Sequence, residues 1–282
     1  MQLNNPGAEI FVPDGVPVEE ALARTTHLAV GAHQDDLEIM AYRGILECFQ
    51  QDDKWFCGVN VTNGAGSPRD DLYRDYTDEM MQVVRRKEQK KAAVVGEYGA
   101  QIFLDYSSSA TKDATNPSVK EDLKKVFLAT RPQIVYTHNL ADKHDTHIAV
   151  TLRVIAALRE LPDDAKPQQV VGCEVWRDLD WMVDTDKVAM DVSPHENLAA
   201  ALLGVFDSQI CGGKRYDLAT IGRRRAHATY AESHGVDVST SLIYGMDLTP
   251  LIHDPSMDVV AYVKVFIDRF AQDVQARIGR VL

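Results

Sequence analysis

The sequence predicts a single α/β domain with a Rossmann-like, doubly wound and mostly parallel sheet. Short apolar runs alternate along its 282 residues with segments of helical periodicity, which is the order expected of a repeating strand and helix. Histidines and aspartates cluster directly after two of these runs. Open α/β sheets bind ligands beyond the carboxyl ends of their strands, so this placement also predicts a metal site at that edge.

Five apolar runs have the length and composition of buried parallel strands. They are residues 26–32, 55–62, 102–106, 133–138 and 170–176. Parallel neighbours need crossover connections that are right-handed, so we expect helices on both faces of the sheet.

Two segments between these runs have the pattern of amphipathic helices. Segment 117–130 opens with Pro117, a residue favoured in a first helical turn, and carries one apolar stripe. Segment 147–159 follows the fourth run. Its predicted apolar stripe consists of Ile148, Leu152, Ile155 and Ala156.

The C-terminal third is predicted to contain fewer regular elements. The tetrapeptide Ser193–Glu196 has the pattern of a capping box with proline at the first helical position, which predicts a helix beginning there. Gly212–Gly213 and residues 233–257 are typical of irregular loops, and residues 258–278 predict a final helix.

No internal repeat, linker or low-complexity segment divides the chain, so we predict one domain over residues 1–282. Residues 233–282 are expected to add loops and a helix at the C-terminal end of this domain. Residues 63–78 are polar and contain glycine, which predicts a loop at the edge of the active site.

The composition excludes several classes of protein. A formal net charge of −12 argues against nucleic-acid binding, although a small anionic substrate can still meet a local cationic site. The four cysteines contain no CxxC pair, which indicates reduced thiols. With no signal-peptide pattern and no apolar run long enough for a membrane span, we expect a cytoplasmic protein. The oligomeric state stays open, a homo-oligomer included.

Two short segments carry residue types that bind metals. His33, Asp35 and Asp36 follow the first apolar run, and "THNLADKHDTH" (137–147) follows the fourth. Two histidines and one carboxylate are a usual set of protein ligands for a catalytic zinc with one open position. The residues alone favour His33, Asp36 and one of His144 and His147.

Each of these residues also has a structural interpretation. An isolated Asp35 or Asp36 is more often a helix N-cap than a ligand. A histidine pair three residues apart, such as His144 and His147, is a weak motif, and His138 could simply hydrogen-bond to backbone at a strand end. The metal site is favoured because the two segments are predicted to meet at one edge of one sheet.

Both segments resemble signatures of the LmbE/PIG-L family of zinc-dependent deacetylases, which act on N-acetylglucosaminyl compounds and related amides. "AHQDDLE" (32–38) is similar to the AHPDDE signature. The family's THxPxDxHxDH pattern is matched at Thr137, His138, Asp142, His144 and His147. Weaker similarity is found at residues 61–67, Arg85 with Glu88 before Ala92–Ala93, 103–106, Asp191, Ser208–Gln209 and 230–232. The resemblance therefore covers about residues 26–232, which it implies to be the LmbE/PIG-L-like core of the domain.

The resemblance implies a role for each matched residue. His33, Asp36 and His147 would bind one Zn²⁺ per chain, and Asp35 would be the general base that takes a proton from the attacking water. His144 would hydrogen-bond to the developing oxyanion and serve as the acid for the leaving amine. Amide hydrolysis requires each of these functions: an activated water, a positioned base and oxyanion stabilisation.

Several positions depart from the family pattern. Gln34 and Leu140 replace prolines, and Leu37 replaces an acidic residue, but none of these changes removes a ligand. Thr146 stands where the family usually has the aspartate that holds the catalytic histidine, and Asp142 or Asp145 could substitute for it. Phe206 and Ala65 replace a histidine and an acidic residue, and these two changes predict an unusual substrate pocket.

Candidate substrate contacts are Arg69, Asn63 and Asp142. Arg69 would bind a phosphate, carboxylate or hydroxyl group, although pairing with a neighbouring aspartate is equally compatible with the sequence. Asn63 is either a turn residue or a hydrogen-bonding partner of the substrate. The run Arg223–Arg225 could face an anionic substrate, but a solvated helix face is the favoured interpretation.

The sequence therefore predicts a zinc-dependent hydrolase that removes an N-acetyl or other N-acyl group from an amino sugar, a sugar conjugate or a related small amide. Its partner would be a small N-acylated substrate. Two alternatives remain: an amidase that cleaves a larger conjugate or natural-product amide, and a catalytically silent metal- or sugar-binding protein. A nucleotide-binding module is disfavoured, because no GxGxxG follows the first strand.

Overall fold

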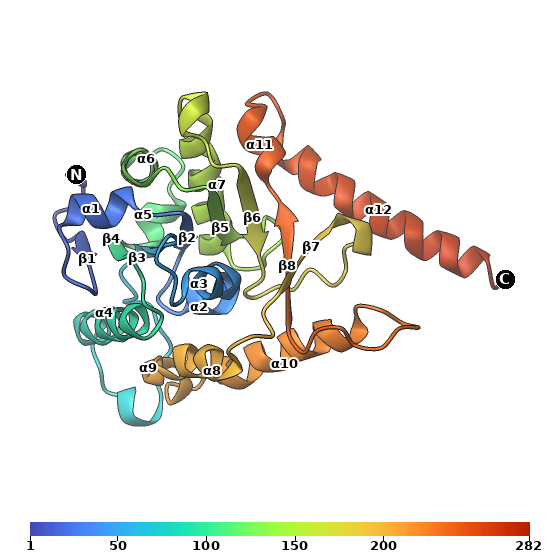
Figure 1. Cartoon of the computed structure of the whole chain (residues 1–282), viewed down its shortest axis with the longest axis horizontal. Helices are drawn as coiled ribbons and strands as arrows, with labels where there is room; N and C mark the ends of the chain where they lie inside the picture. The colour runs from blue at the N-terminus through green and yellow to red at the C-terminus, as the bar shows by residue number, and fades with distance from the viewer.

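A computed structural model describes all residues 1–282 and contains one eight-stranded, mostly parallel sheet with helices on both faces (Figure 1). The strands in chain order are β1 (Glu9–Phe11), β2 (His27–Gly31), β3 (Phe56–Thr62), β4 (Ala100–Tyr106), β5 (Ile134–His138), β6 (Gln169–Cys173), β7 (Lys187–Asp191) and β8 (Leu242–Asp247). Their spatial order is β1-β4-β3-β2-β5-β6-β8-β7. The predicted fold class is confirmed.

The five strands expected from the sequence are β2 to β6, and they pair in parallel. Sequence reasoning missed β1, β7 and β8, which add antiparallel strands at the two sides of the parallel core. The prediction of irregular loops over residues 233–257 is wrong in part, since it contains β8 and a short helix at Thr249–His253. β8 pairs with two strands, and this pairing stabilises a segment whose own pattern is weak.

Helices form one layer on each face of the sheet. The first layer contains α1 (Val18–Ala23), α5 (Ser108–Lys112), α6 (Ser118–Thr130), α7 (Asp145–Arg159) and α11 (Thr249–His253). The second contains α2 (Asp36–Met40), α3 (Tyr42–Cys48), α4 (Asp78–Val95), α8 (Glu196–Gly204), α9 (Asp207–Ile210) and α10 (Tyr216–Tyr230). Two separate apolar clusters lie between these layers and the sheet.

Two details of the predicted helices are wrong. Leu152 of α7 is 37% exposed, and the buried face is formed instead by residues such as Val150, Val154 and Leu158. The helix therefore packs on the sheet with a different side from the one that the predicted apolar stripe marks. The expected capping box at Ser193–Glu196 does not form. The Ser193 hydroxyl donates to Asp191, and α8 begins only at Glu196.

The predicted final helix is present as α12 (Val259–Gly279), which extends away from the sheet (Figure 1). Only Phe266 of this helix is buried. Neither α12 nor any other helix is long and apolar enough to cross a membrane.

Candidate active site

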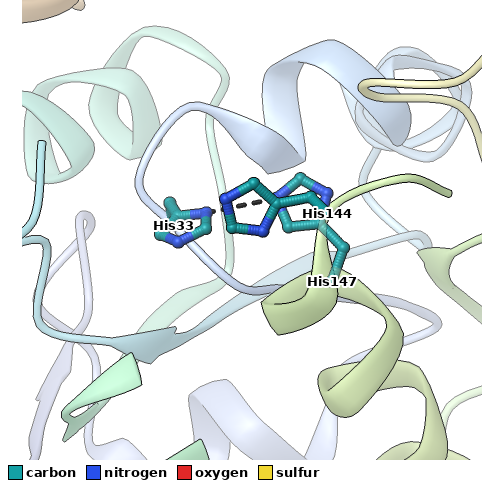
Figure 2. A group of neighbouring side chains, drawn as sticks. All are labelled: His33, His144 and His147. Atoms are coloured by element: carbon teal, nitrogen blue, oxygen red, sulfur yellow. Dashed lines mark hydrogen bonds between the residues drawn. The ribbon is translucent and has the colours of Figure 1, made fainter. Parts of the chain in front are cut away.

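The two motif segments meet where the chain reverses its direction of winding across the sheet. β2 and β5 are neighbours and parallel, but the chain leaves β2 toward β3 on one side and leaves β5 toward β6 on the other. The connections after these strands therefore diverge and leave room between them, which is where such sheets bind ligands. His33 lies in the first connection, and His144 and His147 lie at the start of α7 (Figure 2).

Three potential ligand atoms form a compact triangle at this point. Nδ1 of His33 is 3.2 Å from Nε2 of His147 and 3.4 Å from Oδ2 of Asp36. The third side, from His147 Nε2 to Asp36 Oδ2, is 3.6 Å. Tetrahedral zinc with ligands at about 2.0–2.1 Å has neighbouring ligand atoms about 3.4 Å apart, so this donor set suits a divalent metal.

Two other histidines lie close to the triangle. Nε2 of His138 is 3.4 Å from Asp36 Oδ2, but it already accepts the backbone N–H of Ala32 at 2.9 Å. That hydrogen bond occupies the lone pair that a metal would need. The ring of His144 stacks on His147 at a centroid distance of 4.5 Å, and both rings face His33 (Figure 2).

Asp142 lies behind the triangle and is fully buried. Its Oδ2 atom is 3.4 Å from Nδ1 of His147, and its carboxylate accepts the backbone N–H groups of His144 and Trp176. Burial raises the pKa of Asp142, but the hydrogen bond and charge of His147 outweigh it and hold the pKa below its usual range. Asp142 was expected to contact substrate, yet this geometry favours a role in orienting His147.

Asp35 adopts an unusual backbone conformation with φ of +96°. A non-glycine residue in this region is strained, and such strain is common at functional sites. The Asp35 side chain makes no capping hydrogen bond to α2, although the residue occupies the N-cap position. The structure thus gives no support to the capping interpretation.

The Asp35 carboxylate faces the guanidinium of the buried Arg85 at 3.5 Å. Burial raises the pKa of Asp35, the Arg85 charge opposes this shift, and the charge of Asp36 adds to it. Arg85 also donates to the backbone carbonyl of Gln34, and its Nε and Nη1 atoms have no partner. The resemblance had singled out Arg85, but not its contact with Asp35.

No carboxylate is hydrogen-bonded to the His144 ring, and its Nδ1 atom has no partner. Its burial, followed by the proximity of His147 and His33, lowers the pKa of His144 to about 4. Neither Asp142 nor Asp145 substitutes for the aspartate that the family has at Thr146, since Asp142 contacts only the backbone N–H of His144. At neutral pH the His144 ring is therefore neutral.

A cavity of about 340 Å³ opens over these residues. His33, Asp35, Asp36 and His144 form its floor. Ser67 and Pro68 contribute to its wall, as expected for the predicted loop 63–78.

Arg69 and Asn63 do not line the cavity. Arg69 donates to the Ala65 carbonyl and pairs with Asp78. The Asn63 side chain accepts the Ala65 N–H within a turn. The geometry therefore favours structural roles for both residues over the substrate contacts expected from the sequence.

Sequence reasoning missed other residues of the cavity wall. Trp176, Lys214 and Tyr216 line it, and no motif in the sequence marks them. The solvated helix face expected at Arg223–Arg225 is wrong for Arg224, which is buried and donates to the Glu38 and Ile39 carbonyls of α2.

The fold and the site define an α/β protein with a His/Asp cluster at the carboxyl edge of its sheet. Residues 28–158 match the model of the PIG-L family, described as GlcNAc-PI de-N-acetylase. The resemblance to the LmbE/PIG-L family is therefore confirmed over this region. Comparison with curated proteins gives no match.

Several solved structures share the fold. A 4-carboxy-2-hydroxymuconate hydratase from Pseudomonas putida is 15% identical with a TM-score of 0.58, covering 79% of this chain and 95% of its own. The N,N'-diacetylchitobiose deacetylase from Pyrococcus horikoshii is 17% identical with a TM-score of 0.57, covering 79% and 84%. The A40926 pseudoaglycone deacetylase Dbv21 is 16% identical with a TM-score of 0.58, covering 80% and 98%. At these identities the comparisons establish the fold alone.

Proposed function

We propose that this protein is a metal-dependent hydrolase that removes an N-acyl group from an amino sugar, a sugar conjugate or a related small amide. The observation that carries the proposal is the triangle of His33, Asp36 and His147, with Asp35 lining the same cavity as His33 and Asp36. The family match over residues 28–158 supports a de-N-acylating activity.

His33, Asp36 and His147 would hold one zinc ion. When bound, zinc supplies a Lewis acid that polarises the acyl oxygen and lowers the pKa of water. Asp36 and His147 are buried, whereas the His33 side chain is 24% exposed, so the triangle has one side open to the cavity. Asp142 would keep the Nε2 atom of His147 directed at the site by hydrogen-bonding to the opposite ring nitrogen.

Asp35 would act as the general base, because its carboxylate lines the cavity and no backbone group occupies it as a cap. Burial raises the pKa of Asp35 against the opposing charge of Arg85, and a raised pKa brings a carboxylate closer to the range in which a general base works at neutral pH. The neutral His144 ring would donate a hydrogen bond to the developing oxyanion. Since this ring carries no spare proton at neutral pH, the proton taken up by Asp35 is the one available to the leaving amine.

The experiment combines elemental analysis with a screen for release of free amine. Protein purified without chelator should contain about one zinc ion per chain, and removal of the metal should abolish release of amine. The screen should include N-acetylated sugars, sugar conjugates and larger natural-product-like amides, so that the amidase alternative is tested in parallel. Full activity of a metal-free protein would contradict the proposal, and tight metal binding without any turnover would favour the silent binding protein.

A hydratase shares the fold, so the screen needs an arm for water addition. Incubation with unsaturated carboxylates, followed by loss of their ultraviolet absorbance, provides it. Turnover in this arm alone would replace the proposed reaction with a hydration.

A further inference from the structure

The proposed mechanism leaves one wall of the cavity without a role. This wall contains Trp176, Tyr216 and Lys214. The Trp176 ring lies 6.2 Å from the His144 ring and nearly parallel to it, and the Tyr216 ring meets Trp176 edge-on at 6.1 Å. Nζ of Lys214 is 5.1 Å from the centroid of Trp176. Two aromatic rings and a cation thus lie next to His144 in the lining of the cavity.

Lys214 differs from the other cations around the cavity because it has no carboxylate partner. Arg85 faces Asp35, and Arg69 is paired with Asp78. The next cation along the chain, Arg215, pairs with Asp217. In a protein with a net charge of −12, an unpaired ammonium group on the wall of a cavity is available to an anion.

The position of Lys214 is fixed by a tight turn between α9 and α10. Gly213 has φ of +101°, a conformation that favours glycine. A Cβ atom on Gly212 would lie only 2.0 Å from the Ser208 carbonyl oxygen. The backbone N–H of Lys214 then donates to the Gln209 carbonyl at 2.9 Å. The chain therefore turns back at this point and holds Lys214 against the cavity.

Trp176 is anchored to the same carboxylate that holds the metal-site histidine. Its backbone N–H donates to Oδ2 of Asp142, which also contacts His147. The aromatic wall and the triangle of potential ligands are thus tied together through one buried side chain. A ring that packs on Trp176 would have a fixed position relative to the reacting centre.

We propose that Trp176, Tyr216 and Lys214 form a subsite for a ring that carries an anionic substituent. The ring would pack against Trp176 and Tyr216, and Lys214 would pair with its phosphate or carboxylate. This assignment rests on the proposed function, because it assumes that the amide of the substrate lies next to Asp35. The preferred substrate class is accordingly an anionic, ring-bearing N-acyl compound, such as a phosphorylated or acidic amino sugar.

Binding of deacylated products tests the subsite without requiring turnover. Titration calorimetry on the metal-loaded protein would compare glucosamine, glucosamine 6-phosphate, muramic acid and inorganic phosphate. The two anionic sugars compare a phosphate with a carboxylate, and inorganic phosphate measures how tightly an anion without a ring binds to the metal and Lys214 together. The variants are Lys214→Met and the charge-restoring Lys214→Arg, with Lys87→Met on the exposed face of α4 as the matched control.

We expect the wild type to bind at least one anionic sugar on the order of 10-fold more tightly than glucosamine. This preference should fall with rising salt, disappear in Lys214→Met and return in Lys214→Arg, while Lys87→Met resembles the wild type. The subsite is refuted if the wild type shows no preference, or if Lys214→Met retains it through the metal. A clear preference combined with no turnover of the N-acetylated sugars would instead refute the proposed activity and leave the subsite standing.

Discussion

Oδ2 of Asp142 lies 3.4 Å from Nδ1 of His147, on the side of the ring opposite to His33 and Asp36. A carboxylate in this position fixes the proton on Nδ1 and leaves the Nε2 lone pair directed at the candidate metal site. The same carboxylate accepts the backbone N–H groups of His144 and Trp176. One side chain therefore orients parts of the site that come from two different connections.

Asp142→Asn is expected to lower metal affinity about 10- to 100-fold, because the amide cannot support His147 as a carboxylate does. Competition with a chromophoric chelator measures the affinity. Asp145→Asn, at an exposed position in the first turn of α7, is the control and should retain normal affinity. Equal affinities in the two variants would show that Asp142 does not orient the ligand.

Asp35→Asn should keep the metal and the melting temperature but lose on the order of 100- to 10,000-fold in rate, as expected for loss of a positioned general base. The amide preserves the shape of the side chain but cannot accept the proton. Steady-state kinetics and metal analysis on the same preparation check this. Full activity of the variant would show that Asp35 is not the general base.

Asp36→Ala is expected to lose the metal, and activity with it, since Asp36 supplies one corner of the triangle. Elemental analysis after dialysis, together with circular dichroism to confirm folding, provides the measurement. A folded Asp36→Ala protein that still holds one equivalent of metal would mean that His138 or His144 completes the ligand set instead.

Thr146→Asp should raise the pKa of His144 above about 4, because it adds a carboxylate to the cavity wall near that ring. The part of the pH–rate profile that reports His144 should then move to higher pH, with metal content unchanged. Thr146→Asn adds a similar volume without charge and should leave the profile in place. Identical profiles for the two variants would exclude control of His144 from position 146.

Glu47 provides a pH-dependent contribution to stability away from the site. Its hydrogen bond from His27, helped by Arg43 and opposed by burial, lowers the pKa of Glu47 to about 2 from 4.5. The ionised side chain therefore favours the folded state fully above about pH 4.5, and this contribution is lost as the pH falls toward 2.

Glu47→Gln should accordingly reduce the free energy of unfolding at pH 7, with a deficit that shrinks toward pH 3. Urea denaturation at pH 7, 5 and 3 measures the difference from the wild type, and the exposed Glu20→Gln is the control. A deficit of equal size at all three pH values would mean that Glu47 acts through packing alone.

Local pattern was sufficient to predict the parallel core. The runs that became β2 to β6 are continuously apolar because both faces of each strand are covered, so they stand out without any knowledge of their neighbours. β1, β7 and β8 were missed because they are stabilised mainly by pairing with other strands. The stripe of α7 was misjudged at Leu152, since the side on which a helix docks depends on what it packs against.

The motif segments alone predicted that His33, Asp35, Asp36, His144 and His147 would meet, because connections that follow adjacent parallel strands open at the same edge of a sheet. The residues that surround them depend on long-range packing and could not be predicted in this way. Asp142 contacts His147, Arg85 faces Asp35, and Lys214 reaches the cavity from a turn far along the chain. Such contacts join segments that have no common period or motif. These contacts form when helices and loops pack on the sheet. Their partners therefore cannot be predicted from the pattern of any single segment.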